Sequence, residues 1–369
     1  MAFADIFADL DQAHLRMAMY SSTSLDVEGA LQQPAGKLSA LMALLSPAAE
    51  PYIEQMAQQA MALTQQRFGH NIGLFIPLYL SNLCANECDY CGFTMSNKIK
   101  RKVLNVEEIA TEIQIIKQRQ FDSVLLVSGE HETKVGIQYF KQVVPQVKQH
   151  FSHLAMEVQP LEISEYAQLK GLGLDSVMLY QETYQARTYA QHHTRGKKRD
   201  FTYRLNSPDR LGQAGIDKIG LGVLLGLDDW RLDALMMGHH LHYLENTYWR
   251  SKYSVSLPRL RPCVGGIQPK SPMTDLGLVQ VICAFRLFSE QLEISLSTRE
   301  SAQLRDNLLP LGITHMSAGS STQPGGYAAA TAELDQFEIS DQRSVELIAN
   351  MIANKGYQAI FKDWESGWR

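Results

Sequence analysis

The sequence predicts an α/β protein built on a (β/α)8 barrel of the TIM type, with an N-terminal helical extension and a C-terminal helical closing segment. Short apolar runs alternate with amphipathic helical patterns, as in a parallel sheet with right-handed crossovers. Eight such repeats suggest that the sheet closes on itself. The predicted strands are Leu74–Leu80, Ser123–Val127, Leu154–Val158, Ser176–Tyr180, Lys218–Leu224, Tyr253–Leu257, Ile294–Leu296 and Thr314–Ser317. The predicted helices between them are Val106–Arg119, Ile137–His150, Ile163–Gly171, Phe201–Gly212, Leu232–Leu244, Leu276–Phe288 and Ser301–Leu309.

Polar residues follow the ends of most of the predicted strands, and this second observation supports the same fold. Active sites of such barrels lie at the carboxyl ends of the strands. The residues concerned are Cys84, Ser128 to Glu130, Glu157, Gln159, Gln181, Glu182, Arg259, Arg261, Ser297 to Glu300, Ser317 and Ser320. The pattern therefore places a functional site at this end of the barrel.

The segments that flank the barrel are predicted to be helical. Ser46 followed by Pro47 is typical of a helix start, with serine as the N-cap and proline in the first turn. A second helix is predicted over Ser344–Asn354, with its end marked by Gly356. We expect this second helix to close the bottom or side of the barrel. The chain is accordingly divided into an extension (1–70), the barrel (71–330) and a C-terminal segment packed on the barrel (331–369).

Composition limits the possible functions. The 369 residues carry a net charge of −5 and are 45% hydrophobic, which is typical of a folded globular protein. No apolar run reaches the length of about 18 residues that suggests a membrane span. The N-terminus lacks the features of a secretory signal, and the acidic balance gives no support for nucleic-acid binding. Five cysteines, three of them closely spaced, favour a reducing cytoplasm.

The stretch Leu83–Phe93, LCANECDYCGF, carries the strongest chemical signal. Its cysteines Cys84, Cys88 and Cys91 follow the spacing C-x3-C-x2-C. Four cysteine thiolates complete the coordination of a [4Fe–4S] cluster, whereas three leave one iron open to a small ligand. A structural zinc site would need a second cysteine pair, which the sequence lacks. The motif therefore predicts chemistry at a metal, with Tyr90 placing an aromatic ring beside the open position.

The remaining cysteines, the histidines and the basic clusters are interpreted without a metal. Cys263 lies in a loop after the sixth strand, and as a fourth ligand it would close the open iron, so we expect it not to be a ligand. Cys283 lies in an apolar helix and is expected in the core. The basic clusters Lys98–Lys102 and Lys197–Arg199 are interpreted as solvated faces. The paired histidines are interpreted as solvated or helix-packing residues. They are His192, His193, His239, His240 and His242.

The cysteine spacing, with an aromatic residue before the last cysteine, resembles the signature of the radical S-adenosylmethionine (radical SAM) enzymes. Wider similarity, from about Leu45 to Trp364, is to the tyrosine lyases of bacterial thiazole biosynthesis, the 2-iminoacetate synthase family. The segments that carry it are PLYLSNLCANECDYCGFTMSNKIKR, GEHE, MEVQP, YQETY, GIDKIGLG, PRLRP, LSTRE and TQPGGY. The resemblance implies two cofactors, a [4Fe–4S] cluster on the three cysteines and S-adenosyl-L-methionine.

The resemblance also implies roles for residues near the cysteines. Gly129 and Glu130 stand in the place of the glycine-rich turn that holds the methionine amine, although Ser128 replaces a glycine that many members have. The alternative is that Glu130 is an exposed loop residue. Glu157 and Gln159 flank one residue of a strand and so project to the same face. Both are expected to contact the ribose or the methionine part of the cofactor, with a structural salt bridge as the alternative.

Substrate contacts are expected after the later strands. A guanidinium can bind a carboxylate through two hydrogen bonds. In the related aromatic amino-acid lyases, an arginine in the LSTRE motif binds the substrate carboxylate. The resemblance therefore implies this role for Arg299. An ion pair with Glu300 or with a helix end is the alternative. Ser317 and Arg259 are weaker candidates for substrate contacts.

By resemblance, one electron from the cluster cleaves S-adenosylmethionine to methionine and a 5′-deoxyadenosyl radical, which removes a hydrogen atom from the amino group of L-tyrosine. Cleavage of the Cα–Cβ bond then gives 2-iminoacetate (dehydroglycine) and 4-methylphenol (p-cresol). Because 2-iminoacetate hydrolyses readily, transfer to thiazole synthase on the route to thiamine is expected. Flavodoxin or ferredoxin is the implied reductant.

Three alternatives remain open. The first is the tyrosine lyase of hydrogenase maturation, whose family binds a further cluster through cysteines in a C-terminal extension, whereas the last cysteine of this sequence is Cys283. The second is another radical SAM barrel enzyme, such as biotin synthase or a tryptophan lyase. The third is a non-catalytic iron–sulfur electron carrier, which would require a fourth cluster ligand.

Overall fold

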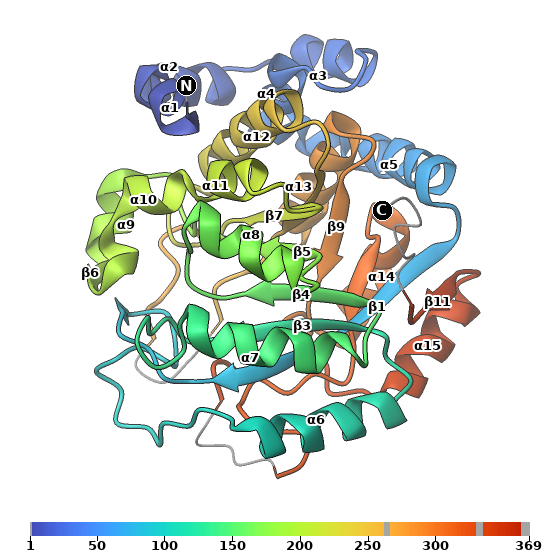
Figure 1. The fold of residues 1–369 in the computed structure, drawn as a ribbon. Coiled ribbons are helices and arrows are strands. Elements are labelled where there is room, and N and C mark those ends of the chain that lie inside the picture. The colour runs from blue at the N-terminus through green and yellow to red at the C-terminus, as the bar shows by residue number, and fades with distance from the viewer. Residues whose placement is uncertain (1, 262–265, 330–334, 363–369) are drawn as a thin grey trace.

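The computed structural model describes residues 2–261, 266–329 and 335–362, and its centre is a closed parallel barrel (Figure 1). The strands follow one another around the barrel in chain order, and the last of them pairs with the first. The barrel strands are β1 (Asn71–Ser81), β3 (Ser123–Ser128), β4 (His153–Glu157), β5 (Ser176–Met178), β7 (Lys218–Gly222), β8 (Lys252–Ser256), β9 (Glu293–Leu296) and β10 (His315–Ser317). Pairing of Gly73, Leu74 and Phe75 with His315, Met316 and Ser317 closes the ring. All eight predicted strands and the predicted barrel are therefore confirmed.

Helices surround the barrel on its outer side (Figure 1). They are α6 (Val106–Gln118), α7 (Ile137–Lys148), α8 (Ile163–Gly171), α9 (Ala186–His192), α10 (Phe201–Leu205), α11 (Ser207–Gln213), α12 (Trp230–Thr247), α13 (Asp275–Phe288) and α14 (Ala302–Leu308). The single helix predicted over Phe201–Gly212 is divided between α10 and α11. Proline has no N–H group and cannot continue a helix through its own position, so Pro208 is accommodated in the first turn of a new helix.

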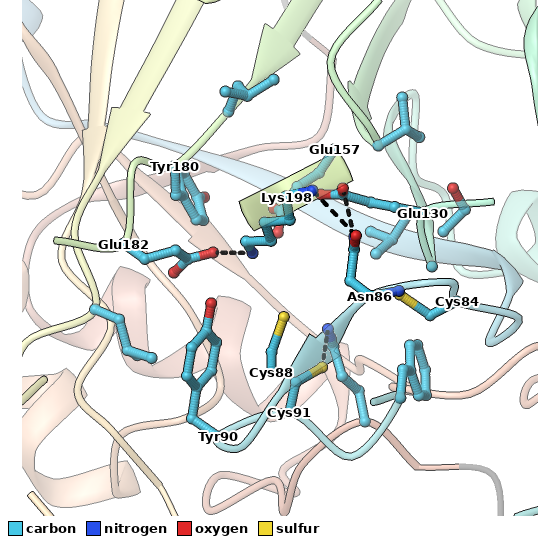
Figure 2. A pocket seen from close by; sticks show the side chains of 18 of the residues that line it. Cys84, Asn86, Cys88, Tyr90, Cys91, Glu130, Glu157, Tyr180, Glu182 and Lys198 are labelled. Atoms are coloured by element: carbon cyan, nitrogen blue, oxygen red, sulfur yellow. Dashed lines mark hydrogen bonds and ion pairs between the residues drawn. The ribbon is translucent and has the colours of Figure 1, made fainter. Parts of the chain in front are cut away.

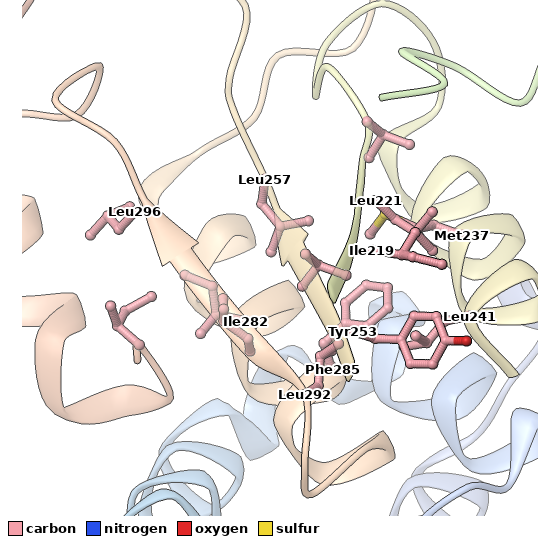
Figure 3. Packing of buried hydrophobic residues seen from close by; sticks show 14 of the residues in the cluster. Ile219, Leu221, Met237, Leu241, Tyr253, Leu257, Ile282, Phe285, Leu292 and Leu296 are labelled. Atoms are coloured by element: carbon pink, nitrogen blue, oxygen red, sulfur yellow. The ribbon is translucent and has the colours of Figure 1, made fainter. Parts of the chain in front are cut away.

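Alternating residues along each strand separate the core from the barrel interior. On β1, Ile72, Leu74, Ile76, Leu78 and Leu80 are almost completely buried in the main hydrophobic cluster. The residues between them, Phe75, Pro77 and Tyr79, line a cavity inside the barrel. The same alternation packs β7, β8 and β9 against α12 and α13 (Figure 3). Since successive side chains of a strand point to opposite faces, the apolar pattern shows which strand residues face the core and which face the barrel interior.

The N-terminal extension forms a layer of helices against α12 and α13 (Figure 1). It comprises α1 (Phe3–Asp9), α2 (Gln12–Tyr20), α3 (Ser24–Leu31), α4 (Leu38–Leu45), a 3-10 helix (Pro47–Tyr52) and α5 (Ile53–Phe68). Arg231 of α12 donates to the Leu45 carbonyl at 2.9 Å and forms an ion pair with Glu50. The predicted helix start at Ser46 and Pro47 is confirmed, because a helical segment begins at Pro47 and continues into α5. Its first turns form a 3-10 helix, however, and the Ser46 hydroxyl donates to the Ala43 carbonyl instead of capping the helix.

The C-terminal segment contacts both ends of the barrel. Helix α15 (Val345–Asn354) leads to β11 (Gln358–Ile360), which pairs with the first three residues of β1. Residues 335–341, here called the C-terminal strap, cross the opposite end. The backbone N–H groups of Ser340 and Asp341 donate to the Thr298 carbonyl, just beyond β9. The expected closure of the bottom or side therefore describes only half of this segment, and the division into 1–70, 71–330 and 331–369 stays a prediction.

Three further short strands were not predicted from the sequence. Besides β11, these are β2 (Glu87–Cys88) and β6 (His193–Arg195), which pair with each other in an antiparallel arrangement. Neither has the apolar length by which a strand is recognised in sequence. None of the helices in the described part of the chain combines the length and apolarity needed to cross a bilayer.

A buried ion pair fixes the strap, and its loss should destabilise the protein. Arg305 and Asp341 form a salt bridge in which both side chains are fully buried. Breaking one partner of such a pair leaves a buried charge uncompensated, so Asp341→Asn should lower the free energy of unfolding by roughly 3 kcal/mol. Urea unfolding followed by circular dichroism measures this change.

The control for this prediction lies in the same network. Asp306 pairs with Arg343 at 2.8 Å where both side chains are partly exposed, so Asp306→Asn should cost less than about 1 kcal/mol. Equal losses in the two variants would contradict the importance given to the buried pair.

Candidate active site

The three motif cysteines line a single cavity at the carboxyl end of the barrel strands (Figure 2). The cavity is open to solvent, and its volume including this opening is about 910 Å³. The cysteines belong to the connection between β1 and α6, in the stretch Leu83–Phe93, here called the cysteine loop. Cys88 pairs with His193 where β2 meets β6, and it is only 5% exposed. The structure therefore brings together the thiols that the sequence predicts to act together.

An arginine organises the backbone of this connection. Arg101 donates hydrogen bonds of 2.6 to 3.1 Å to the carbonyl oxygens of Asn82, Phe93, Thr94 and Asn97. Bonds from a charged donor are stronger than those between neutral groups. One guanidinium thus joins both ends of the cysteine loop and holds the cysteines between them.

The three cysteines on the wall of one cavity offer the thiolate ligands that hold an iron–sulfur cluster. Burial raises the pKa of Cys84 to about 11 and that of Cys88 well above its ordinary value. Both thiols therefore release protons when a metal cluster binds.

Tyr90 is fixed at the wall of the cavity by His193. The hydroxyl of Tyr90 lies 2.6 Å from His193 Nε2, while Nδ1 of the same ring lies 2.7 Å from the Tyr189 carbonyl. Burial lowers the pKa of His193 to about 2, so the imidazole is neutral and Nδ1–H donates to the carbonyl. Nε2 consequently accepts from Tyr90. His193 is therefore a helix-packing histidine, one of the two predicted interpretations, and it is not solvated.

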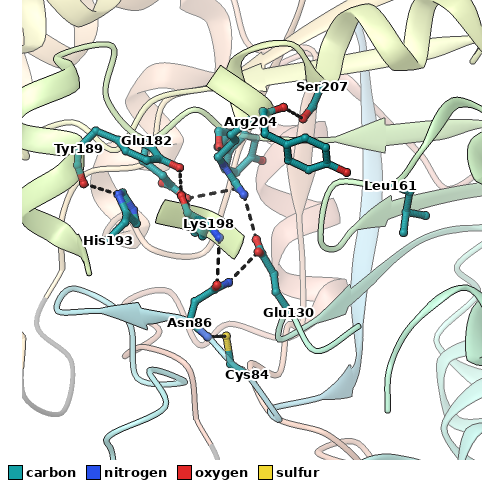
Figure 4. Close-up of polar contacts among 12 residues, drawn as sticks. Cys84, Asn86, Glu130, Leu161, Glu182, Tyr189, His193, Lys198, Arg204 and Ser207 are labelled. Carbon is teal, nitrogen blue, oxygen red and sulfur yellow. Dashed lines mark hydrogen bonds and ion pairs between the residues drawn. The ribbon is translucent and has the colours of Figure 1, made fainter. Parts of the chain in front are cut away.

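A buried network of two acids and two cations borders the cysteines (Figure 4). Arg204 pairs with Glu130 at 3.0 Å, and Lys198 pairs with Glu182 at 2.6 Å. Asn86 of the cysteine loop joins them, donating to Glu130 at 2.7 Å and accepting from the Lys198 backbone N–H. Burial would raise the pKa of both carboxyl groups, but the cations outweigh it and lower both pKa values.

Lys198 corrects one prediction from the sequence. The cluster Lys197–Arg199 was expected to be a solvated face, yet the Lys198 side chain is only 10% exposed. Its ammonium lies over the Tyr90 ring, 5.6 Å from the ring centre. Likewise Glu130 is not an exposed loop residue, because its carboxylate accepts from Asn86 and Arg204.

Gly129 lies directly beneath the cysteine loop. Its backbone N–H donates to the Ser81 carbonyl at 2.9 Å. A Cβ at this position would come within 2.4 Å of the Leu83 carbonyl oxygen and 3.2 Å of Cys84 Cβ. Only glycine therefore lets the end of β3 approach the loop this closely.

A second cavity of about 630 Å³ lies inside the barrel and shares a wall with the first. Residues that line both cavities are Val127, Glu157, Tyr180, Pro258, Arg299, Gln336 and Phe337. The guanidinium of Arg299 lies 3.6 Å from the centre of the Phe337 ring. Arg299 and Ser317, both predicted to contact the substrate, therefore border the inner cavity. Its other serine and threonine residues are Ser256, Ser295, Ser297, Thr298, Ser320 and Thr322.

Two of the predicted site residues lie elsewhere. Arg259 lines neither cavity, because Glu300 and Asp275 bind its guanidinium. This also removes the alternative in which Arg299 pairs with Glu300. Gln159 lines neither cavity and donates to the Val135 carbonyl, since β4 ends at Glu157 and the strand alternation does not continue. Cys283 is fully buried in α13, as predicted, whereas Cys263 lies outside the described residues.

Several site residues were not proposed from the sequence. Asn86, Gln336 and Phe337 lie in loops, Lys198 lies in a 3-10 helix, and Arg204 lies in the short helix α10, where only its helical pattern was recognised. Glu182 was recognisable only by its place after the fourth predicted strand. Its backbone φ of 70° is uncommon for a residue other than glycine and marks a constrained turn. The sequence does not reveal this conformation.

Comparisons with known proteins agree with this geometry. Residues 78–237 match the model of the radical SAM superfamily, and residues 256–358 match the biotin and thiamin synthesis associated domain. The 2-iminoacetate synthase of Escherichia coli (strain K12) is 54% identical over 99% of this chain and 97% of its own length. The same enzyme of Salmonella typhimurium (strain LT2) is 53% identical over the same shares.

Solved structures show the same fold. HydG, a maturase of the [FeFe]-hydrogenase, superposes with a TM-score of 0.91 at 30% identity, covering 97% of this chain and 81% of that chain. Methylornithine synthase superposes with a TM-score of 0.72 at 21% identity, covering 90% of this chain and 96% of that chain. The second likeness supports the fold alone.

Replacing Gly129 with alanine should impair cluster loading. The added Cβ would displace the Leu83 carbonyl and Cys84, so Gly129→Ala should bind less than roughly half of the wild-type iron after anaerobic reconstitution. Iron and sulfide assays measure this directly. Gly171→Ala is the matched control, because a Cβ there meets no atom within 4 Å. Full iron content in Gly129→Ala would disprove the proposed steric role.

Glu157 should make the stability of the cofactor-free protein depend on pH. Burial raises the pKa of Glu157 to about 7, and Arg299 offsets this only in part. Since the folded pKa lies above the unfolded one, the stabilising contribution is present at low pH and is lost as the pH rises through about 7. Relative to wild type, Glu157→Gln should therefore gain up to about 1.4 kcal/mol per pH unit between about pH 5 and 7, then level off. Urea unfolding at several pH values tests this, and a difference independent of pH would contradict it.

Proposed function

Because the chain belongs to the 2-iminoacetate synthase family of radical SAM enzymes, we propose that it cleaves the Cα–Cβ bond of L-tyrosine to 2-iminoacetate and 4-methylphenol. The observation that carries the proposal is the connection between the cysteine cavity and the inner cavity through Glu157, Tyr180 and Arg299. A cofactor in the first cavity and an amino acid in the second would meet at this wall.

The cysteine cavity suits the two cofactors. Cys84, Cys88 and Cys91 would hold the [4Fe–4S] cluster and leave one iron open. When bound, the cluster and S-adenosylmethionine would together supply the carbon radical that removes a hydrogen atom from the substrate. The methionine part of this cofactor carries an ammonium and a carboxylate. The buried network offers a partner of opposite charge for each: the acids Glu130 and Glu182 for the ammonium, and the cations Lys198 and Arg204 for the carboxylate.

The inner cavity suits a zwitterionic aromatic amino acid. Among the described residues, no carboxylate forms a salt bridge with Arg299, so its guanidinium is available for the tyrosine carboxylate. Glu157 would accept a proton or a hydrogen bond from the amino group. Phe75, Pro77 and Leu125 offer apolar surface for the ring, and the surrounding hydroxyls offer partners for the phenol oxygen. Ser317 remains a candidate contact, whereas the position of Arg259 does not support one.

The closed barrel contributes by excluding water. Charged groups interact more strongly in a dry cavity, and a reactive substrate is protected there from side reactions. Arg299 and Glu157 would hold the amino acid at both of its charged ends, which restricts its orientation toward the cysteine cavity. These functions need only the side chains of this chain.

Partners follow from the chemistry of the product. 2-Iminoacetate hydrolyses readily, so we propose direct transfer to thiazole synthase, toward the thiazole of thiamine. The match to the biotin and thiamin synthesis associated domain supports this pathway. A flavodoxin or ferredoxin would supply the electron, and a cytoplasmic location would suit both partners.

Product analysis tests the proposal. The reconstituted protein, incubated anaerobically with S-adenosylmethionine, dithionite and L-tyrosine, should form 4-methylphenol and 5′-deoxyadenosine together, as measured by chromatography. Cys88→Ala should lose both products, and Arg299→Leu should reduce 4-methylphenol at least roughly tenfold by losing a charged hydrogen bond. Arg261→Leu is the control, because Arg261 lines neither cavity and pairs with Glu300.

The other outcomes separate the alternatives. Formation of 5′-deoxyadenosine without 4-methylphenol would retain the radical SAM enzyme and refute tyrosine as substrate. An intact cluster that forms neither product would favour the electron carrier.

A further inference from the structure

The C-terminal strap reaches the cysteine loop through Gln336. The backbone N–H of Gly92 donates to the Gln336 carbonyl at 3.1 Å, and the N–H of Gln336 donates to the Thr322 carbonyl at 3.1 Å. A Cβ at position 92 would lie 2.4 Å from the Gln336 oxygen. The residue directly after Cys91 is therefore in close backbone contact with a segment more than 200 positions further along the chain.

The side chain of Gln336 connects two groups of the site. Its Nε2 lies 3.7 Å from Cys91 Sγ, the contact drawn as a dashed line at Cys91 in Figure 2. The Tyr79 hydroxyl donates to its Oε1 at 2.7 Å. The Tyr79 hydroxyl can donate or accept, whereas a cluster-bound thiolate sulfur only accepts, so the amide nitrogen faces Cys91 and the amide oxygen faces Tyr79. Gln336 thus presents an N–H donor to the third cysteine.

A donor at this position has a defined electrochemical effect. The reduction potential of an iron–sulfur cluster depends on its net charge, its exposure and the hydrogen bonds to its sulfur atoms. Reduction adds negative charge, which a neutral N–H donor stabilises more strongly than it stabilises the oxidised form. The donor therefore makes the cluster easier to reduce.

The next residue of the strap faces the substrate side. Phe337 stacks on Arg299, and both residues line the two cavities. The strap is anchored behind them by its bonds to Thr298 and by the buried Arg305–Asp341 pair. Two neighbouring residues of one anchored segment thus hold a cluster ligand and an arginine of the inner cavity.

We propose that Gln336 is a positioning residue that holds Cys91 and raises the reduction potential of the cluster, while Phe337 orients Arg299 on the same strap. The part about Gln336 depends only on membership of the radical SAM superfamily. The part about Phe337 rests on the proposed function, in which Arg299 binds the tyrosine carboxylate.

The first test is the midpoint potential of the reconstituted cluster, measured by redox titration with electron paramagnetic resonance in the absence of S-adenosylmethionine and tyrosine. Gln336→Leu removes the donor at nearly constant volume and should shift the potential to a more negative value. Gln342→Leu is the matched control, because this glutamine is exposed, just beyond the strap, and should leave the potential unchanged. An unchanged potential in a fully iron-loaded Gln336→Leu variant would overturn the proposal.

Tyr79→Phe provides a second route if Gln336→Leu does not load iron. It retains Gln336 but removes the hydroxyl that orients the amide, so it should shift the potential in the same direction by a smaller amount. A wild-type potential in this variant would overturn the proposal as well.

Phe337→Leu tests the other half of the strap. Loss of the contact with Arg299 should weaken tyrosine binding roughly 2- to 10-fold in equilibrium dialysis and leave the potential unchanged. Unaltered tyrosine binding would overturn the role given to Phe337. If wild-type protein binds no tyrosine at all, the proposed function fails while the potentials of the Gln336 variants still decide the first part.

Discussion

The site depends on how a cysteine loop with little regular structure is held in one conformation. Its only strand, β2, has two residues, so its shape comes from contacts with other segments. Arg101 holds the backbone ends, Gly129 supports the loop from β3, and the strap contacts it at Gly92. Three thiols can hold one cluster only if their relative positions are fixed, so these contacts are as necessary as the cysteines.

Charge is the second constraint on the site. Glu130, Glu182, Lys198 and Arg204 are all mostly buried, and taking ions out of water is costly even when they are paired. An apolar packing of similar volume would commonly be at least as stable. A buried network with equal numbers of acids and cations is better explained by a ligand that carries both charges, because each end of that ligand then finds a partner of opposite sign.

The barrel and the cysteines were predictable from the sequence for a clear reason. Buried parallel strands give continuous apolar runs, and the cysteine motif is local. The charged network was not predictable, since a run such as Lys197–Arg199 looks the same whether it is solvated or, like Lys198, buried. Arg259 and Arg299 both follow predicted strands, and only the family resemblance made Arg299 the stronger candidate. They differ in the structure because Glu300 binds the first and leaves the second facing the cavities.

The position of the strap changes how the chain should be divided. A boundary at residue 330 separates Gln336 and Phe337 from the barrel, although both line the two cavities. Gln336 contacts Cys91, and Phe337 contacts Arg299. The matching biotin and thiamin synthesis associated domain, which covers residues 256–358, contains Arg299 and the strap together. A segment that binds a cluster ligand on one side and an arginine of the inner cavity on the other is functionally part of the barrel mouth. A truncation at residue 330 would therefore remove part of the site itself.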